Sequence, residues 1–184
     1  MSEFDELTPR ERGWLLALWN RLRSRDNLAM GTFAEHVVAE TLPGSRLRTF
    51  SMATYDIDWE GISIEVKSSV QRQEGTNEKD RPSAEKWEVR PHYGWDEDAG
   101  AWHPGDRKRW ARVYVLARHE GFSHLEGWSF YVVPCWWLDG RNAVTVTGGG
   151  LRTAGWGPHS ADELPDVVRE RAATTPPSDE APTA

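Results

Sequence analysis

Apolar residues recur along the chain with two different periods, which predict helices first and strands afterwards. Residues 30–42 place their apolar side chains on one helix face, and Pro43–Gly44 is a typical stop. The same spacing over residues 8–22, after a capping threonine and a proline, predicts an earlier helix. From residue 55 onward apolar and polar residues alternate, which predicts strands.

The clearest element is a hairpin around Glu60–Gly61. The apolar positions of its two arms are Tyr55, Ile57, Trp59, Ile62, Ile64 and Val66. A two-residue turn would place residue 59 opposite 62 and Asp56 opposite Glu65. Because side chains alternate along a strand, Asp56, Asp58, Glu65 and Lys67 are expected to share the polar face.

The remaining pattern predicts more strands, loops and a final helix. Strands are expected at 87–90, 113–117, 128–133 and 144–147, loops at 71–86 and 94–106, and a helix from the capping box at 160–163 to about residue 171. Gly148–Gly150 are expected to lack the strand–glycine–helix order of a phosphate loop. Helices followed by strands and a last helix predict an α/β or α+β sandwich.

Length and composition fit one soluble domain. The 184 residues, with a net charge of −7, are enough for one core. We expect a single domain over 1–173, with a helical segment at 8–42 and a catalytic core at 31–147. Residues 174–184 are rich in proline and acids and are expected to be disordered.

The single cysteine excludes an internal disulfide and multi-cysteine metal sites. No apolar run reaches the roughly 18–20 residues of a membrane span, and the acidic start does not resemble a signal peptide. A cytoplasmic location is therefore expected.

The charge is uneven along the chain, so the net charge of −7 does not describe every segment. Residues 161–184 carry much of the negative charge, whereas residues 9–25 are rich in arginine. A second basic stretch holds Arg107, Lys108, Arg109, Arg112 and Arg118 without an acid. Either patch would suit nucleic acid, although charged runs usually just face solvent.

The polar face of the hairpin contains the candidate catalytic residues. Two carboxylates directly across a ladder repel each other, and a divalent cation such as Mg²⁺ would turn that penalty into a binding site. Lys67 lies two residues after Glu65 on the same face, in a chain where arginine far outnumbers lysine. Unlike arginine, lysine has a pKa that shifts readily, and it could position or activate a water molecule. The simpler alternative is a solvated hairpin face with a Glu–Lys pair.

Three segments together resemble the PD-(D/E)xK nuclease superfamily. They are Glu35 on the predicted helix, Tyr55–Asp58 and Ile64–Ser69, and the stretch 109–115 is similar to uncharacterised bacterial members. Tyr55 stands where the motif name has proline, a frequent variation, and Asp58 competes with Asp56 as the ligand. We prefer Asp56 because it is expected opposite Glu65. The resemblance implies a restriction-endonuclease-like fold: a central mixed β-sheet flanked by helices.

The resemblance also implies roles for individual residues. Asp56 and Glu65 would bind Mg²⁺ or Mn²⁺, with the Val66 carbonyl, and Glu35 would hold a metal-bound water or a second ion. Lys67 would orient the attacking water or stabilise charge on the phosphate. Expected substrate contacts, or else ordinary polar strand-end residues, are Ser68, Ser69, Gln71 and Gln73.

The implied function is a Mg²⁺-dependent DNA endonuclease in restriction, repair or junction processing. Cutting both strands with one site per chain generally needs two chains, so a homodimer is one expectation. One alternative is an inactive protein of the same fold that binds nucleic acid or a protein partner. Another is a metal-free interaction protein in which tryptophans form a dimer face. Most tryptophans are expected in the core or an interface, with base stacking the alternative for Trp87, Trp95 and Trp102.

Overall fold

A computed structural model gives the structure of the protein. It describes residues 27–48, 53–70, 85–96, 100–105, 107–119 and 127–176, together with Thr8, Gly13 and Leu15. Most of the helix expected at 8–22, of the loop at 71–86 and of the tail at 174–184 lies outside the described residues.

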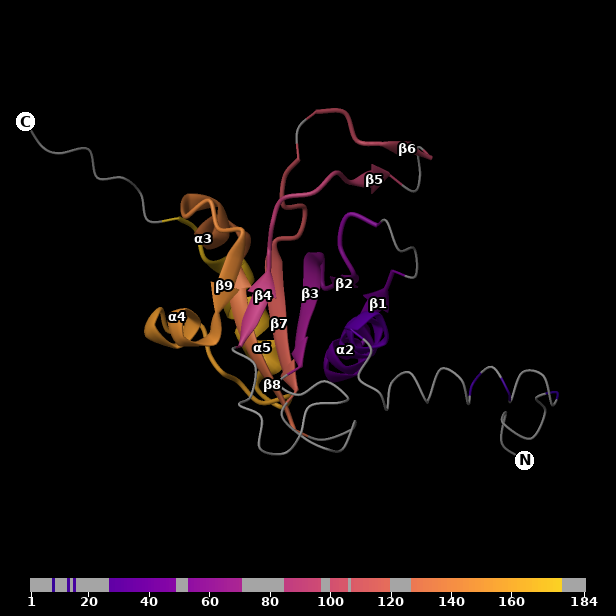
Figure 1. Cartoon of the computed structure of the whole chain (residues 1–184), viewed down its shortest axis with the longest axis horizontal. Coiled ribbons are helices and arrows are strands. Elements are labelled where there is room, and N and C mark those ends of the chain that lie inside the picture. The colour runs from indigo at the N-terminus through magenta and orange to yellow at the C-terminus, as the bar shows by residue number, and fades with distance from the viewer. Residues whose placement is uncertain are drawn as a thin grey trace, which may run out of the picture.

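A five-stranded mixed sheet forms the centre of the protein (Figure 1). In spatial order its strands are β1 (Arg46–Leu47), β2 (Ile57–Trp59), β3 (Ile62–Val70), β7 (Val113–His119) and β8 (Trp128–Pro134). β3 and β7 are parallel, and the other neighbours are antiparallel. The α/β class with a central mixed sheet flanked by helices is therefore confirmed.

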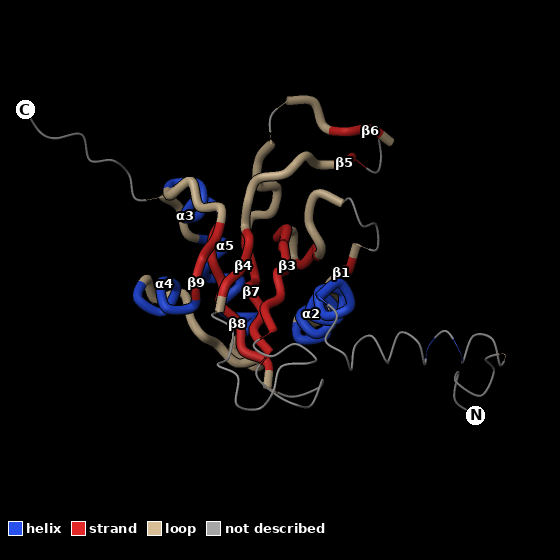
Figure 2. The backbone as a smooth tube through the Cα atoms, viewed as in Figure 1, coloured by secondary structure: helices blue, strands red, loops and turns tan. Residues whose placement is uncertain are grey.

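Helices and a small second sheet cover the two faces of the central sheet (Figure 2). On one face lie α2 (Asn27–Thr41) and α5 (Leu164–Ala173). On the other lie α3 (Cys135–Gly140), α4 (Gly148–Thr153) and the pair β4 (Lys86–Glu88) and β9 (Thr145–Thr147). None of the helices in the described part has the length and hydropathy of a membrane span.

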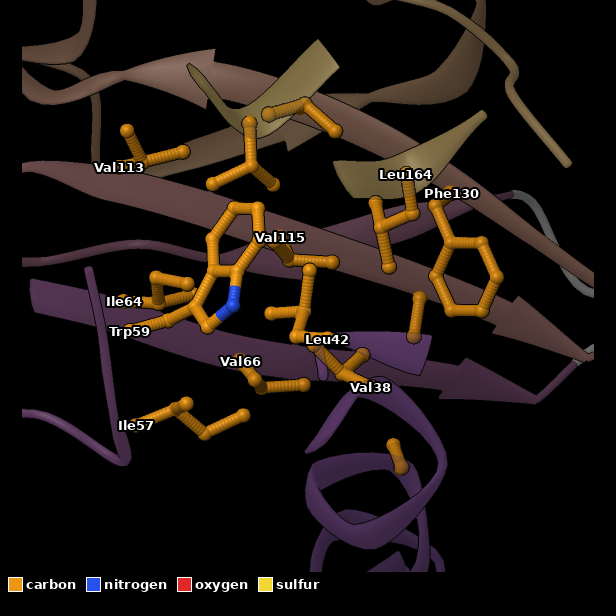
Figure 3. Close-up of a cluster of buried hydrophobic side chains, with 14 of the residues drawn as sticks. Val38, Leu42, Ile57, Trp59, Ile64, Val66, Val113, Val115, Phe130 and Leu164 are labelled. Atoms are coloured by element: carbon orange, nitrogen blue, oxygen red, sulfur yellow. The ribbon is translucent and has the colours of Figure 1, made fainter. Parts of the chain in front are cut away.

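The first core lies between the sheet and the helices α2 and α5 (Figure 3). Alternate residues of β3, including Ile64 and Val66, point into it, as do Val38 of α2 and Leu164 of α5. Trp59 is 1% exposed, and its indole N–H donates to the Pro43 carbonyl at 3.0 Å. Burying such a face fixes the register of a strand, because a shift of one residue would turn every core side chain outward.

The opposite face of the sheet carries a second core. Tyr114, Leu116 and Tyr131 of the sheet pack there against Trp87 of β4 and Leu138 of α3. β3 contributes apolar residues to the first core only, so the second face of this strand is left for polar side chains.

The hairpin has the expected register. Ile57 pairs with Ile64 and Trp59 with Ile62. Glu60 and Gly61 both have positive φ, 50° and 77°, which is the backbone of the tight turns that suit hairpins. Tyr55 differs from the expectation: it packs against the second core rather than with Ile57, because β2 and its alternation begin only at Ile57.

Two other expectations were wrong. The segment 94–106, expected as a loop, contains the antiparallel pair β5 (Trp95–Asp96) and β6 (Ala101–Trp102). Gly148–Gly150 begin helix α4 directly after β9, so the strand–glycine–helix order is present. Trp95 and Trp102 contact each other across the β5–β6 pair. At the start of α4, the Thr147 side chain caps the helix by accepting from Gly150 N–H.

A carboxylate anchors the start of α4. Glu85 pairs with Arg118 at 2.6 Å and with Arg152 at 2.8 Å, and it is only 10% exposed. Its backbone carbonyl accepts from Gly148 N–H at 3.1 Å. A Cβ on Gly148 would lie 1.6 Å from the Glu85 carboxylate, so a larger residue here would displace Glu85.

Gly148→Ala is therefore expected to lower the melting temperature by several degrees, because moving Glu85 breaks two ion pairs in a poorly solvated place. Gly149→Ala is the matched control: a Cβ there meets nothing within 4 Å, and alanine favours a helix over glycine. Thermal unfolding of both variants measures the difference. Equal melting temperatures would contradict the tight packing of Gly148 against Glu85.

Candidate active site

Four residues from three separate segments meet in one pocket on the polar side of the hairpin. They are Glu35, Asp56, Glu65 and Lys67. The pocket is open to solvent, with a volume of about 550 Å³. The other lining residues are Ala53, Glu88, Arg90, His92, Tyr93 and Trp102.

Backbone hydrogen bonds hold Asp56 from both sides. Its N–H donates to the Ile64 carbonyl at 3.0 Å, and its carbonyl accepts from Arg48 N–H at 2.7 Å. Ile64 is also the ladder partner of Ile57, so Asp56 lies just outside the regular β2–β3 ladder. One carboxylate oxygen, Oδ2, accepts from Val66 N–H at 2.7 Å. The side chain is therefore fixed against β3.

Glu65 and Lys67 project from β3, the strand between β2 and β7. Val66, the residue between them, points into the first core, so both face the pocket. Glu65 is 4% exposed, and its Oε1 accepts from the Lys67 ammonium in an ion pair. Lys67 keeps 39% of its side chain exposed and can therefore contact a ligand in the pocket.

Glu35 reaches the same pocket from helix α2. The helix buries Met30, Ala34 and Val38, spaced four residues apart, against the sheet. Glu35 follows Ala34 and lies at the border of this buried stripe. Helix packing thus brings a third carboxylate beside the two on the hairpin.

The carboxyl groups resist ionisation in this arrangement. Burial, together with the charges of neighbouring carboxylates, raises the pKa of Glu35 to about 7 and the pKa of Asp56 to about 7. Burial likewise raises the pKa of Glu65, although Lys67 opposes the shift. Burial alone would lower the pKa of Lys67, but Glu65, Asp56 and Glu35 outweigh it and the pKa is raised. At neutral pH the pocket therefore holds a protonated lysine among crowded carboxyls.

The sequence did not lead us to predict that residues of the segment 88–93 line the pocket. Trp87 and Val89 are buried, whereas Glu88, Arg90 and His92 line the pocket. This alternation of apolar and polar residues is visible in the sequence and indicates a polar face on that segment. Glu88 and Arg90 form an ion pair, and burial followed by the Lys67 charge lowers the pKa of His92.

Other predicted residues lie away from the pocket. Asp58 accepts from the Tyr55 hydroxyl at 2.7 Å and pairs with Arg48 at 3.7 Å, but it does not line the pocket. Ser68 and Ser69 belong to β3 without lining the pocket. Gln71 and Gln73 lie outside the described residues, so their role as substrate contacts stays a prediction.

The second basic patch is largely used for structure. Arg109 is 7% exposed and donates to the Val89 carbonyl at 2.8 Å and to Asp139. Arg112 donates to the Ala172 carbonyl at 2.7 Å, and Arg118 pairs with Glu85. Arg107 and Lys108 are exposed. The first patch, residues 9–25, lies almost entirely outside the described residues.

The three tryptophans considered for base stacking differ in exposure. Trp87 is 2% exposed and donates to the Ala117 carbonyl at 3.1 Å, so base stacking by this residue is excluded. Trp95 is half-buried, whereas Trp102 is 50% exposed and lines the pocket.

Oxygen ligands for a metal ion are present but not fully gathered. In the described part of the chain, no three His, Cys, Asp or Glu side chains come together closely enough to hold an ion. Asp56 Oδ2 and Glu65 Oε1 already have hydrogen-bond partners, which leaves Oδ1 and Oε2 for a cation. These are the hard ligands that Mg²⁺ prefers, and Mg²⁺ usually needs only one or two carboxylates.

Comparison with known proteins gives a limited result. No family model matches the chain, and no curated protein matches it. Among solved structures it is similar to a bacterial homing endonuclease, I-Ssp6803I, with a TM-score of 0.40 and 17% identity over 66% of this chain and 77% of that chain. At this TM-score and identity the match does not by itself establish a shared fold or activity.

The raised pKa of Asp56 predicts how the stability of the metal-free protein depends on pH. A carboxyl whose pKa rises from 3.8 to about 7 on folding costs no stability below pH 4; the cost grows as pH rises to about 7 and is constant above it. Asp56→Asn removes this cost and still offers an acceptor to Val66 N–H. We expect the variant to melt several degrees above the wild type at pH 8 and close to it at pH 4.

Thermal unfolding with a chelator present, from pH 4 to 8, measures this effect. Asp58→Asn is the matched control, because it changes a carboxylate two residues away that lies outside the pocket. If the wild type is as stable as Asp56→Asn at pH 8, the Asp56 charge does not destabilise the fold and the prediction is wrong.

Proposed function

We propose that this protein is a nuclease of the PD-(D/E)xK type that hydrolyses phosphodiester bonds in DNA with Mg²⁺ or Mn²⁺. The observation that carries the proposal is the convergence of Glu35, Asp56, Glu65 and Lys67 from a helix and a hairpin into one open pocket. Residues far apart in the sequence are brought together there although their repulsion opposes folding.

A divalent cation suits the charges of the pocket. Three carboxyl groups share the pocket with one lysine, and burial, followed by repulsion between the carboxylates, raises their pKa values; a bound cation would relieve both costs. Asp56 and Glu65 would hold the ion through the oxygens that lack a partner among the described residues. When bound, it would polarise a phosphoryl oxygen and favour hydroxide as the nucleophile.

Lys67 would act as a charged donor. Its raised pKa keeps the ammonium protonated at neutral pH, so it is poorly suited to remove a proton from water. A protonated ammonium at the pocket surface would instead orient the attacking water or stabilise negative charge on the phosphate. Its contact with Glu65 fixes its position.

Glu35 would complete the site from the helix. With a pKa of about 7 it is partly protonated near neutrality, and it would hold a water molecule by donating or accepting a hydrogen bond. Cleavage of both DNA strands would then use two copies of the chain, each supplying one pocket.

One observation favours a second function. Because no three ligands are gathered in the described residues, the pocket also suits a protein of this fold that binds DNA without cutting it. The two functions differ in one respect that is easily measured: only the nuclease changes the covalent state of the DNA.

The nuclease predicts nicking or cutting of supercoiled plasmid by the purified protein with Mg²⁺ or Mn²⁺, and loss of cutting with a chelator. Glu65→Gln, Asp56→Asn and Lys67→Ala should each lower the rate by at least about 100-fold, because each removes a metal ligand or the charged donor. Gel electrophoresis of the plasmid over time gives the rates.

Asp58→Asn is the control for this assay and should cut at the wild-type rate, since Asp58 is on the same hairpin but outside the pocket. Cutting that survives Lys67→Ala or Glu65→Gln would show that this pocket is not the active site. DNA binding without cutting, in either metal, would favour the second function.

A further inference from the structure

Two exposed aromatic side chains border the carboxylate pocket. Tyr93 is 51% exposed and Trp102 is 50% exposed, and both line the pocket with Asp56 and Glu65. We call these two side chains the aromatic rim. Only two other large hydrophobic residues in the described part of the chain, Leu15 and Val144, are comparably exposed. Exposed aromatic surface next to a polar site is typical of ligand contact.

Trp102 is held in place by the β5–β6 pair. It lies opposite Trp95, with the two rings in an edge-to-face arrangement at 5.4 Å between centroids and 86° between planes. Trp95 in turn bridges to Ala53, which also lines the pocket. Figure 1 shows the β5–β6 pair beyond the end of the central sheet. The pair thus presents the Trp102 ring from a fixed support.

Tyr93 is supported by the residues around Trp110. The Trp110 indole donates to the carbonyl of His92 at 3.1 Å and stacks on His103 at 4.4 Å between centroids. Gly94, directly after Tyr93, has no room for a Cβ because Trp110 lies 2.5 Å from that position. Tyr93 itself lies under the Arg107 guanidinium, 5.0 Å from the ring centroid.

We propose that the aromatic rim stacks on an unpaired base next to the phosphate held in the carboxylate pocket. This inference rests on the proposed nuclease function and names its substrate class: single-stranded DNA, or duplex DNA interrupted by a bulge, flap or junction. The ring of an aromatic side chain stacks on any base whose face is free. In an intact duplex both faces of a base are covered by neighbouring base pairs.

The charges beside the rim agree with a short unpaired substrate. Arg90 lines the pocket and Arg107 lies over Tyr93, so two guanidinium groups are close to where the strand would pass. Arg109, Arg112 and Arg118 are engaged in bonds within the fold. The described surface near the pocket therefore offers local phosphate contacts and aromatic faces rather than a broad basic track for a long duplex.

Fluorescence anisotropy tests the inference with three labelled oligonucleotides of one sequence: a single strand, a blunt duplex and a duplex with a two-nucleotide bulge. A chelator is present, so that binding is measured without cutting. We expect the wild type to bind the single strand and the bulged duplex more tightly than the blunt duplex. Trp102→Ala and Tyr93→Ala should weaken the first two by about tenfold and leave the third unchanged.

Two further variants separate stacking from structural damage. Trp102→Phe keeps an aromatic face and should restore most of the binding, and Val144→Ala changes an equally exposed residue outside the pocket and should have no effect. Equal loss on all three oligonucleotides, no loss on any, or no binding at all would overturn the inference. These outcomes do not depend on cutting, so a failed plasmid assay with selective binding would reject the nuclease alone.

Discussion

Asp56, just before β2, and Glu65 of β3 lie together in one pocket where both are poorly solvated, and the energetics of this pocket depend on that proximity. Burial raises the pKa values of both groups, the Glu65 charge adds to the rise at Asp56 and the Glu35 charge to the rise at Glu65, and Lys67 offsets only part of the cost. A pocket that destabilises its own charges in this way is suited to bind a cation. The charges of the neighbouring carboxylates also raise the pKa of Lys67, so the lysine stays protonated at neutral pH.

The rest of the fold keeps the two carboxylates in the same pocket. The tight turn at Glu60–Gly61 sets the register of the hairpin, and the buried side chains on the far side of β2 and β3 prevent a shift by one residue. Helix α2 packs on that buried face and so delivers Glu35 to the pocket. The aromatic rim is built separately, on the β5–β6 pair and the Trp110 contacts, and approaches the pocket from beyond the sheet.

The sequence predicted the parts of this arrangement that depend on local pattern. The alternation around Glu60–Gly61 was enough to predict the hairpin register, in which Ile57 pairs with Ile64, and helical spacing was enough to place Glu35 at the edge of a buried face. It could not predict the long-range contacts. Arg109, read as part of a basic patch, is buried because its guanidinium bonds Val89 and Asp139, which the fold brings near. The strands β5 and β6 are too short for a periodicity, and tryptophans facing each other hold them together.

Metal titration tests the central claim most directly, because it measures the cation site without requiring cleavage. Isothermal titration of the purified protein with Mn²⁺ near pH 7.5 should detect binding that Asp56→Asn and Glu65→Gln each weaken by tenfold or more, while Asp58→Asn leaves it unchanged. Equal Mn²⁺ binding by the wild type, Asp56→Asn and Glu65→Gln, or none by the wild type, would contradict the claim that these two carboxylates form a cation site.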